Sequence, residues 1–192
     1  MKPPILVSLC VCAAAAVARA QAPAVTGPAA ALAARRPAPF PGAPVIRRGP
    51  LRIDTDGVIQ DLNLRRRVIA RDRWHKDDTS LRLDDGALDP TVVPYIVLPE
   101  GYHGARLGDL ARVTYRGRAA WAVCGDRGPR RRFGEGSVAL ARRLGIDPDG
   151  RTGGADDGVL YEIFPRSARF APRTQRELTT YLWRLELGLP AS

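Results

Sequence analysis

Two carboxylic acids, Asp126 and Glu135, lie nine residues apart in a glycine-rich segment, Val123–Ser137. Such a pair can supply one acid and one base to a hydrolytic reaction when both side chains are held beside a substrate. A purely structural interpretation is also open, in which Asp126 shapes a turn and Glu135 lies in the first turn of a helix, where a negative charge is favoured. The rest of the chain has to decide between the two.

Cys124 adjoins this pair and is a second candidate for chemistry. The other two cysteines, Cys10 and Cys12, fall within the first twenty residues, so an exported form would have a single thiol and no internal disulfide. The only imidazoles, His75 and His103, are far away in sequence and lie in no thiol-enzyme signature. We therefore expect Cys124 to act as a small buried hydrophobe.

The N-terminus predicts export. Lys2 precedes an apolar run at Ile5–Val17, and Ala18–Ala20 has the small-x-small pattern of a cleavage site, so residues 1–20 are interpreted as a signal peptide. The apolar run is too short for a transmembrane segment, which needs about 20 residues. We expect a secreted or periplasmic protein. Residues 21–50, rich in Ala, Pro and Arg, are predicted to be a flexible spacer.

The formal net charge of +10 lies mainly in the flanking regions. Residues 72–165 carry fourteen basic and fifteen acidic side chains, so the centre of the chain is almost neutral. Basic tails bind polyanions without specificity. The charge therefore does not predict a specific nucleic-acid partner, and we expect a monomer.

A second acidic pair, Asp54 and Asp56, ends a strand-like segment, Leu51–Gly57. The alternation of apolar and polar residues followed by Asp-Gly is typical of a strand that closes in a turn. The residues that follow lack the spaced ligands and final Glu of a calcium loop. A turn is the simpler interpretation, and a place in a substrate cleft is the alternative.

The remaining elements would position these acids. A hairpin, Gly108–Tyr115 with Arg118–Cys124, leads directly into the glycine-rich segment, and a short helix, Ser137–Leu144, follows it. A Thr174–Glu177 capping box precedes leucines at helical spacing. These patterns favour a mainly β protein, a small barrel over residues 51–165, followed by a basic linker and amphipathic helix over 166–192. Further strands are expected at Ser80–Leu83, Val92–Pro99 and Val159–Phe164.

Eight short motifs in a fixed order give the chain a resemblance that no single motif carries. They are Ile53–Gly57, Asp78–Ser80, Val93–Pro99, Gly108–Leu110, Gly125–Pro129, Gly134–Ser137, Leu144–Pro148 and Gly153–Phe164. In this order they resemble the family 75 glycoside hydrolases, the fungal-type endo-chitosanases, over about residues 51–164.

The resemblance implies a secreted hydrolase that cleaves β-1,4 bonds of chitosan or a related glucosamine polymer, by inversion, without metal or other cofactor. It implies a six-stranded barrel of the double-psi type and places the catalytic pair on Asp126 and Glu135. We favour Glu135 as the acid, because Phe133 beside it could raise its pKa by desolvation. The matched stretch also nominates six substrate-binding residues: Asp54, Asp56, Thr79, Tyr95, Arg127 and Asp156.

One departure from the family affects the substrate. Arg127 and Arg130–Arg132 stand where the family has Thr and small or polar residues, and four arginines should repel protonated chitosan. Either they point away while acids such as Asp156 line the groove, or the substrate is less cationic, as an N-acetylated polymer or a peptidoglycan strand would be. Two other functions stay open: a non-catalytic barrel that binds cell-wall glycan, and a polyanion-binding scaffold driven by the arginine tails.

Overall fold

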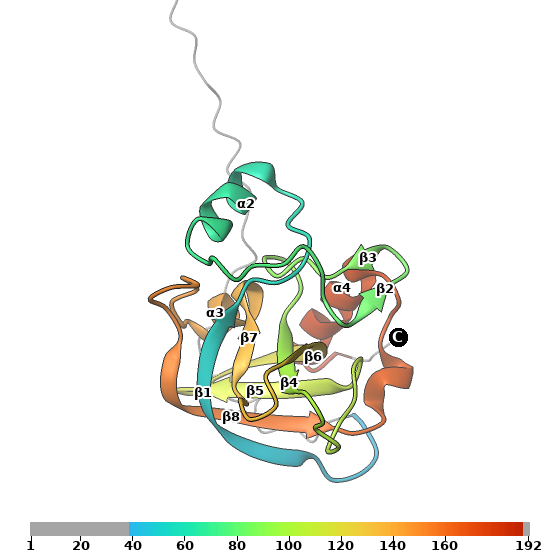
Figure 1. Cartoon of the computed structure of the whole chain (residues 1–192). Helices are drawn as coiled ribbons and strands as arrows, with labels where there is room; N and C mark the ends of the chain where they lie inside the picture. Colours follow the sequence, from blue (N-terminus) through green and yellow to red (C-terminus); the bar gives the residue numbers. More distant parts are fainter. Residues whose placement is uncertain (1–38, 190–192) are drawn as a thin grey trace, which may run out of the picture.

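Six strands form a closed barrel in the computed structural model, which describes residues 39–189 (Figure 1). The order around the barrel is β1-β7-β4-β6-β5-β8. The β1–β7 and β4–β6 pairs are parallel, and the other pairs are antiparallel. The predicted six-stranded barrel is confirmed, and its finer assignment to the double-psi type stays a prediction. The strands are β1 (Val45–Asp54), β4 (Tyr95–Pro99), β5 (Leu110–Tyr115), β6 (Arg118–Gly128), β7 (Glu135–Ser137) and β8 (Ala155–Phe164).

The predicted hairpin is formed by β5 and β6. Tyr115 pairs with Arg118, and the turn residues Arg116 and Gly117 have φ values of 44° and 77°. Glycine adopts such positive φ values without strain, so Gly117 fits the turn, whereas Arg116 tolerates an uncommon conformation. The second strand of the hairpin, β6, continues beyond its pairing with β5 and contains Asp126.

Side chains alternate between two hydrophobic clusters, as strand geometry requires. One cluster, which includes Ile96, Leu98, Val113 and Cys124, fills the barrel. Burial raises the pKa of the Cys124 thiol well above its ordinary value, and the expectation of a small buried residue is confirmed. The other cluster lies outside the barrel and joins strand residues to the C-terminal helix: Leu88, Tyr95, Val97, Trp121, Val123, Phe164, Leu178 and Leu182.

The folded part begins earlier than the sequence predicted. The boundary at residue 51 is wrong, because β1 starts at Val45 and Phe40 is 8% exposed against the outer cluster. Pro50 is compatible with this strand because the β1–β8 register shifts between Gly49 and Leu51, where a residue without an amide hydrogen is tolerated. The proposed signal peptide and residues 21–38 of the proposed spacer lie outside the described residues.

Within residues 39–189, three α-helices accompany the barrel: α2 (Leu62–Ile69), α3 (Val138–Leu144) and α4 (Gln175–Glu186). The α3 helix begins after the predicted Ser137 cap and ends at Gly145, whose φ is 72°. The capping box of α4 is confirmed, since the Thr174 hydroxyl donates to the Glu177 carboxylate and accepts from the Glu177 amide. The other short elements are β2 (Arg82–Leu83), β3 (Gly86–Ala87) and the 3-10 turn η1 (Ser167–Phe170).

The helices occupy different sides of the barrel. The α2 helix lies over the end of the barrel where β1 finishes, whereas α3 and α4 pack against β6 (Figure 1). Within residues 39–189, no helix is long and apolar enough to cross a membrane. Of the candidate acids, Asp54 ends β1, Asp126 lies in the second half of β6 and Glu135 begins β7.

Candidate active site

A bulge at Gly125 turns Asp126 toward the site. The β4–β6 register shifts there, so Ile96 pairs with Cys124 and Val97 with Asp126. A methyl group at position 125 would lie 2.6 Å from Cβ of Tyr95 and 2.7 Å from Cδ1 of Leu88. Only glycine fits this close approach, and the bulge it permits sets the direction of the Asp126 side chain.

The Asp126 carboxylate is 6% exposed and is held by three donors. The amide of Ser80 donates to Oδ1 at 2.8 Å, the Ser80 hydroxyl donates at 2.5 Å, and the amide of Arg127 donates at 2.7 Å. The Leu81 amide also donates to the Gly125 carbonyl, which ties the Ser80 segment to β6. Asp126 therefore has a fixed orientation, as an acceptor surrounded by donors.

Glu135 lies in β7, and the interpretation that placed it in the first turn of a helix is wrong. Helix α3 starts three residues later, after the Ser137 cap, and Asp126 likewise lies in a strand and not in a turn. Val97 of β4 pairs with Glu135 on one side and with Asp126 on the other. Residues paired across neighbouring strands share a face, so the two acids flank Val97 in one row, about 10 Å apart between Cα atoms at the usual strand spacing.

The surroundings of Glu135 raise the pKa of its carboxyl group, mainly through desolvation. Arg132, 3.6 Å from Oε1, and Arg52 oppose this shift, whereas the charge of Asp126 adds to it. Gly128 leaves the space that the carboxylate uses, since a methyl group there would lie 3.0 Å from Oε2. Glu135 is therefore the better candidate for a proton donor, and desolvation is the expected cause of its raised pKa, whereas the share of Phe133 in that desolvation stays a prediction.

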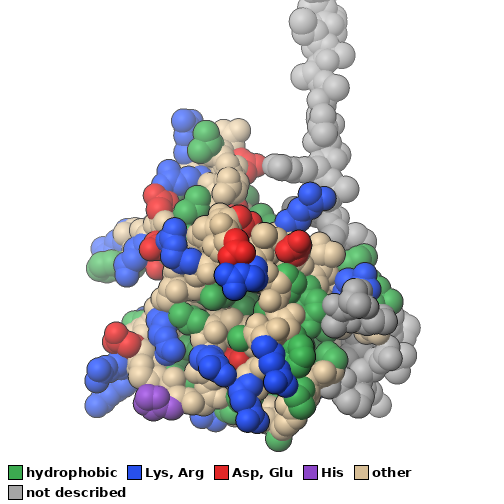
Figure 2. Space-filling view, turned by 90° about the vertical axis from the view of Figure 1, so that its right-hand side faces the viewer, with side chains coloured by type: hydrophobic (Ala, Val, Ile, Leu, Met, Phe, Trp, Pro, Cys, Tyr) green, Lys and Arg blue, Asp and Glu red, His purple; other side chains and the backbone are tan. Residues whose placement is uncertain are grey.

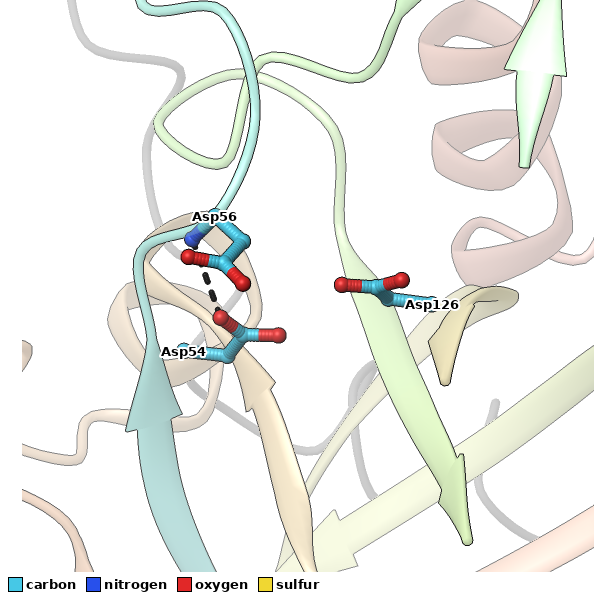
Figure 3. Close-up of side chains that lie close together, drawn as sticks. All are labelled: Asp54, Asp56 and Asp126. Carbon is cyan, nitrogen blue, oxygen red and sulfur yellow. Dashed lines mark hydrogen bonds between the residues drawn. The ribbon is translucent and has the colours of Figure 1, made fainter. Parts of the chain in front are cut away.

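Two further carboxylates join Asp126 (Figure 3). Asp54 ends β1, Asp56 follows it, and one oxygen from each of the three acids lies within 4.8 Å of the others. The Asp56 amide donates to Asp54 Oδ1 at 2.9 Å. Desolvation raises the pKa of Asp56 and raises that of Asp54 well above its ordinary value, and the charge of Asp126 adds to both shifts. The pair therefore lies beside Asp126, and its place in a substrate cleft stays a prediction.

These three carboxylates are also the group, within residues 39–189, whose spacing could hold a metal ion. Oxygen ligands of this kind suit hard cations such as Ca²⁺ or Mg²⁺. Acidic clusters of this size are common without an ion, and hydrolysis by two carboxylates requires none.

The structure separates the other nominated residues from the acids or gives them structural roles. Tyr95 is fully buried, and its hydroxyl donates to the Asp56 carbonyl, so it supports the acidic loop and offers no ring face to a sugar. Thr79 is 4% exposed, and its hydroxyl donates to Leu81 and accepts from the Leu88 amide. Strand alternation turns the Arg127 side chain away from that of Asp126, toward the Pro99 carbonyl. Asp156 is exposed near the start of β8.

Sequence reasoning missed two features of the site. Ser80, and not its neighbour Thr79, contacts Asp126. Arg47, assigned to the spacer, lines a cavity together with residues that follow β4 and precede β7. The Asp78–Ser80 motif was a signal for Ser80, because neighbouring residues in an extended segment point opposite ways. No sequence signal joined Arg47 to residues more than fifty positions away.

Comparisons with known proteins do not assign a family. No family model matches the chain, and no curated protein matches it significantly. Among solved structures, the chain is similar to a Streptomyces papain inhibitor, at 14% sequence identity and a TM-score of 0.39, over 65% of this chain and 97% of that one. So distant a likeness carries no functional argument, and the function has to be argued from the site.

Proposed function

We propose that this protein is a secreted glycoside hydrolase that cleaves β-1,4 bonds of chitosan or a related glucosamine polymer by inversion. The observation that carries the proposal is the row Asp126–Val97–Glu135, in which two acids share one face with a single strand between them. An inverting reaction needs carboxyl groups about 6.5–9.5 Å apart, so that a water molecule fits beside the sugar. Side chains that lean toward each other from Cα atoms about 10 Å apart can meet this requirement.

The environments of the two acids support different roles. Glu135, whose pKa is raised by desolvation, protonates the leaving oxygen of the glycosidic bond. Asp126, held by the Ser80 and Arg127 donors, accepts a proton from the attacking water. Asp54 and Asp56 lie beside Asp126 and supply the negative potential that suits a protonated glucosamine.

The resemblance of the motifs to family 75 chitosanases supports the same reaction class. The Gly125–Pro129 and Gly134–Ser137 motifs contain the bulge, the open space at Gly128 and the β7 acid that build the row. Secretion through the N-terminal signal and action as a monomer belong to the proposal. The non-catalytic alternative, a barrel that binds cell-wall glycan, shares every feature except turnover.

Replacing the acid separates hydrolysis from binding. We expect Glu135→Gln to lower kcat about 10²–10⁴-fold, the usual contribution of a general acid, while affinity for a glucosamine oligomer changes little. Activity is measured as new reducing ends from chitosan of graded acetylation, N-acetylglucosamine oligomers and peptidoglycan strands, and affinity is measured by calorimetry.

The matched control is Glu177→Gln, which makes the same chemical change in the capping box of α4, where glutamine is an accepted substitute. It should leave both quantities unchanged. Wild-type protein that binds these glycans but releases no reducing ends would rule out the hydrolase and leave the binding barrel.

A further inference from the structure

A cavity of about 320 Å³ lies at the end of β4, where Pro99 is one of its lining residues. This volume falls within the range of about 300–1,000 Å³ that is typical of ligand sites. The loop after β4 and the loop before β7 form most of its wall, and both lie at the lower end of the barrel in Figure 1. Its lining residues are Arg47, Pro99, Glu100, Gly101, Tyr102, Arg130, Arg131 and Phe133.

The charge of this cavity is opposite to that of the Asp54–Asp56–Asp126 cluster. Its lining has three arginines and one acid, Glu100, which lies 3.7 Å from Arg130. Within residues 39–189, Arg131 has no carboxylate partner. Figure 2 shows Lys and Arg side chains gathered over the lower part of one face of the molecule, below most of the acidic side chains of that face. These arginines would repel a cationic sugar and form no ion pair with a neutral one, whereas a carboxylate would pair with their guanidinium groups in bidentate fashion.

Aromatic rings give the cavity a surface for a sugar. Tyr102 and Phe133 lie with ring centroids 6.1 Å apart, and the Arg47 guanidinium lies 5.5 Å from the centre of the Tyr102 ring. The Tyr102 hydroxyl is buried and has no hydrogen-bond partner within the described residues. That hydroxyl packs against Gly104, where a methyl group would lie 2.6 Å from it, so the contact proposed for a sugar is with the ring and not with the hydroxyl.

The cavity is adjacent to the scissile position that the proposed function defines. Pro99 lies two residues after Val97, which corresponds to about 7 Å along a strand, and it pairs with Gly128 next to the Glu135 carboxylate. Arg132, between the cavity residues Arg131 and Phe133, forms the ion pair with Glu135. A glycan that places one bond at Glu135 would extend its neighbouring unit into the cavity.

We infer that this cavity is a subsite for a carboxylate-bearing sugar unit, so the substrate is a glycan in which glucosamine units alternate with acidic units. The inference rests on the proposed function for the position of the cleaved bond. In this inference the Asp54–Asp56–Asp126 cluster binds the glucosamine unit. The arginines, which would repel chitosan, bind the carboxylate-bearing unit. Peptide-free peptidoglycan strands carry the acidic unit in alternation, and their glucosamine units become cationic when they are de-N-acetylated.

The test compares one polymer with and without its charge. Binding is measured by calorimetry on the Glu135→Gln protein, which blocks turnover, using peptide-free peptidoglycan strands and the same strands with their carboxyl groups amidated. We expect at least tenfold tighter binding of the carboxylate form, the size of a charge-assisted hydrogen-bond pair, and loss of this preference when Arg130→Gln and Arg131→Gln are added. Glucuronate should displace the strands better than inorganic phosphate.

The matched control adds Arg66→Gln and Arg67→Gln, an exposed neighbouring pair in α2 with the same change in charge, and should keep the preference. Equal affinity for both polymers overturns the subsite, even if Glu135 proves catalytic on chitosan. Stronger displacement by phosphate overturns the carboxylate assignment. A wild-type protein that prefers the carboxylate form but cleaves no glycan overturns the proposed function and leaves the subsite standing.

Discussion

At the scale of single residues, Asp54 is in an unfavourable place for a charge. Desolvation is the largest cause that raises its pKa, and the charges of Asp56, Asp126 and Glu135 add to it. The folded protein therefore holds the Asp54 proton more tightly than the unfolded chain does. Acids concentrated in this way are typical of functional sites, where stability is traded for a reactive arrangement.

A pH dependence of stability follows from this shift. Below about pH 4, the ordinary pKa of Asp, both states carry the proton and Asp54 is neutral. As the pH rises above that value toward the raised pKa of the folded state, the unfolded chain releases the proton first, so stability falls. We expect Asp54→Asn to increase the free energy of unfolding at pH 8 and to change it much less at pH 4, as measured by urea denaturation.

The control for this prediction is Asp156→Asn, which removes a charge from an exposed position on β8. It should change the free energy of unfolding by no more than about 0.5 kcal/mol at either pH, as surface substitutions usually do. A loss of stability in Asp54→Asn at pH 8 would mean that the hydrogen bond from the Asp56 amide outweighs desolvation.

At the scale of elements, the sequence predicted the parts of the fold that depend on local patterns. The β5–β6 hairpin, the Ser137 and Gly145 caps of α3 and the capping box of α4 each depend on a few neighbouring residues. The position of Glu135 depended on a distant partner, because β7 is a three-residue strand stabilised by β1 and β4. A strand that short has no periodicity to detect.

The candidate site was predictable to a similar extent. The resemblance of the motifs predicted Asp126 and Glu135 as the acids. In the structure both residues pair with Val97, which puts them on one face of the sheet. The contacts of Tyr95 and Thr79 could not be read locally, because the β4–β6 pairing and the Gly125 bulge decide which side chains are buried. Arg47 was assigned to a spacer because seven prolines between Gln21 and Pro50 outweighed the pattern of β1.

The α4 helix stabilises the strand that carries Asp126. It packs on β6, and Leu182 is fully buried in the outer cluster with Trp121 and Val123. We expect Leu182→Ala to lower the free energy of unfolding by about 2–5 kcal/mol, the usual cost of such a cavity. Leu189→Ala, at a residue 44% exposed beyond the helix, should cost less than about 1 kcal/mol. Equal losses in thermal or urea denaturation would contradict the packing role of α4.

At the scale of the whole molecule, the charges are arranged along one axis of the barrel. The Asp54–Asp56–Asp126 cluster lies toward the end covered by α2, and the arginine-lined cavity lies toward the other end. Glu135 pairs with Val97 of β4, two residues before the cavity residue Pro99. A net charge of +10 says nothing of this separation, which depends on how the loops are distributed between the two ends. The separation gives a bound glycan a direction, because each end favours a unit of opposite charge.

Phe40, which precedes β1, is buried in the cluster outside the barrel. Phe40 packs with ring centroids 5.6 Å from those of Trp121 and Phe164 and 5.7 Å from that of Phe170, so it joins β6, the end of β8 and η1. We expect Phe40→Ala to lower the free energy of unfolding by about 3 kcal/mol or more, as loss of a buried Phe does, and Phe40→Leu by less than half as much. Because the ring contacts of Phe40 are with Trp121, Phe164 and Phe170 and with neither acid, the Phe40→Leu protein should keep the affinity of the Glu135 site for glycan. A Phe40→Ala protein as stable as wild type in urea would show that the folded domain begins at β1, and that the residues before Val45 contribute nothing to its core.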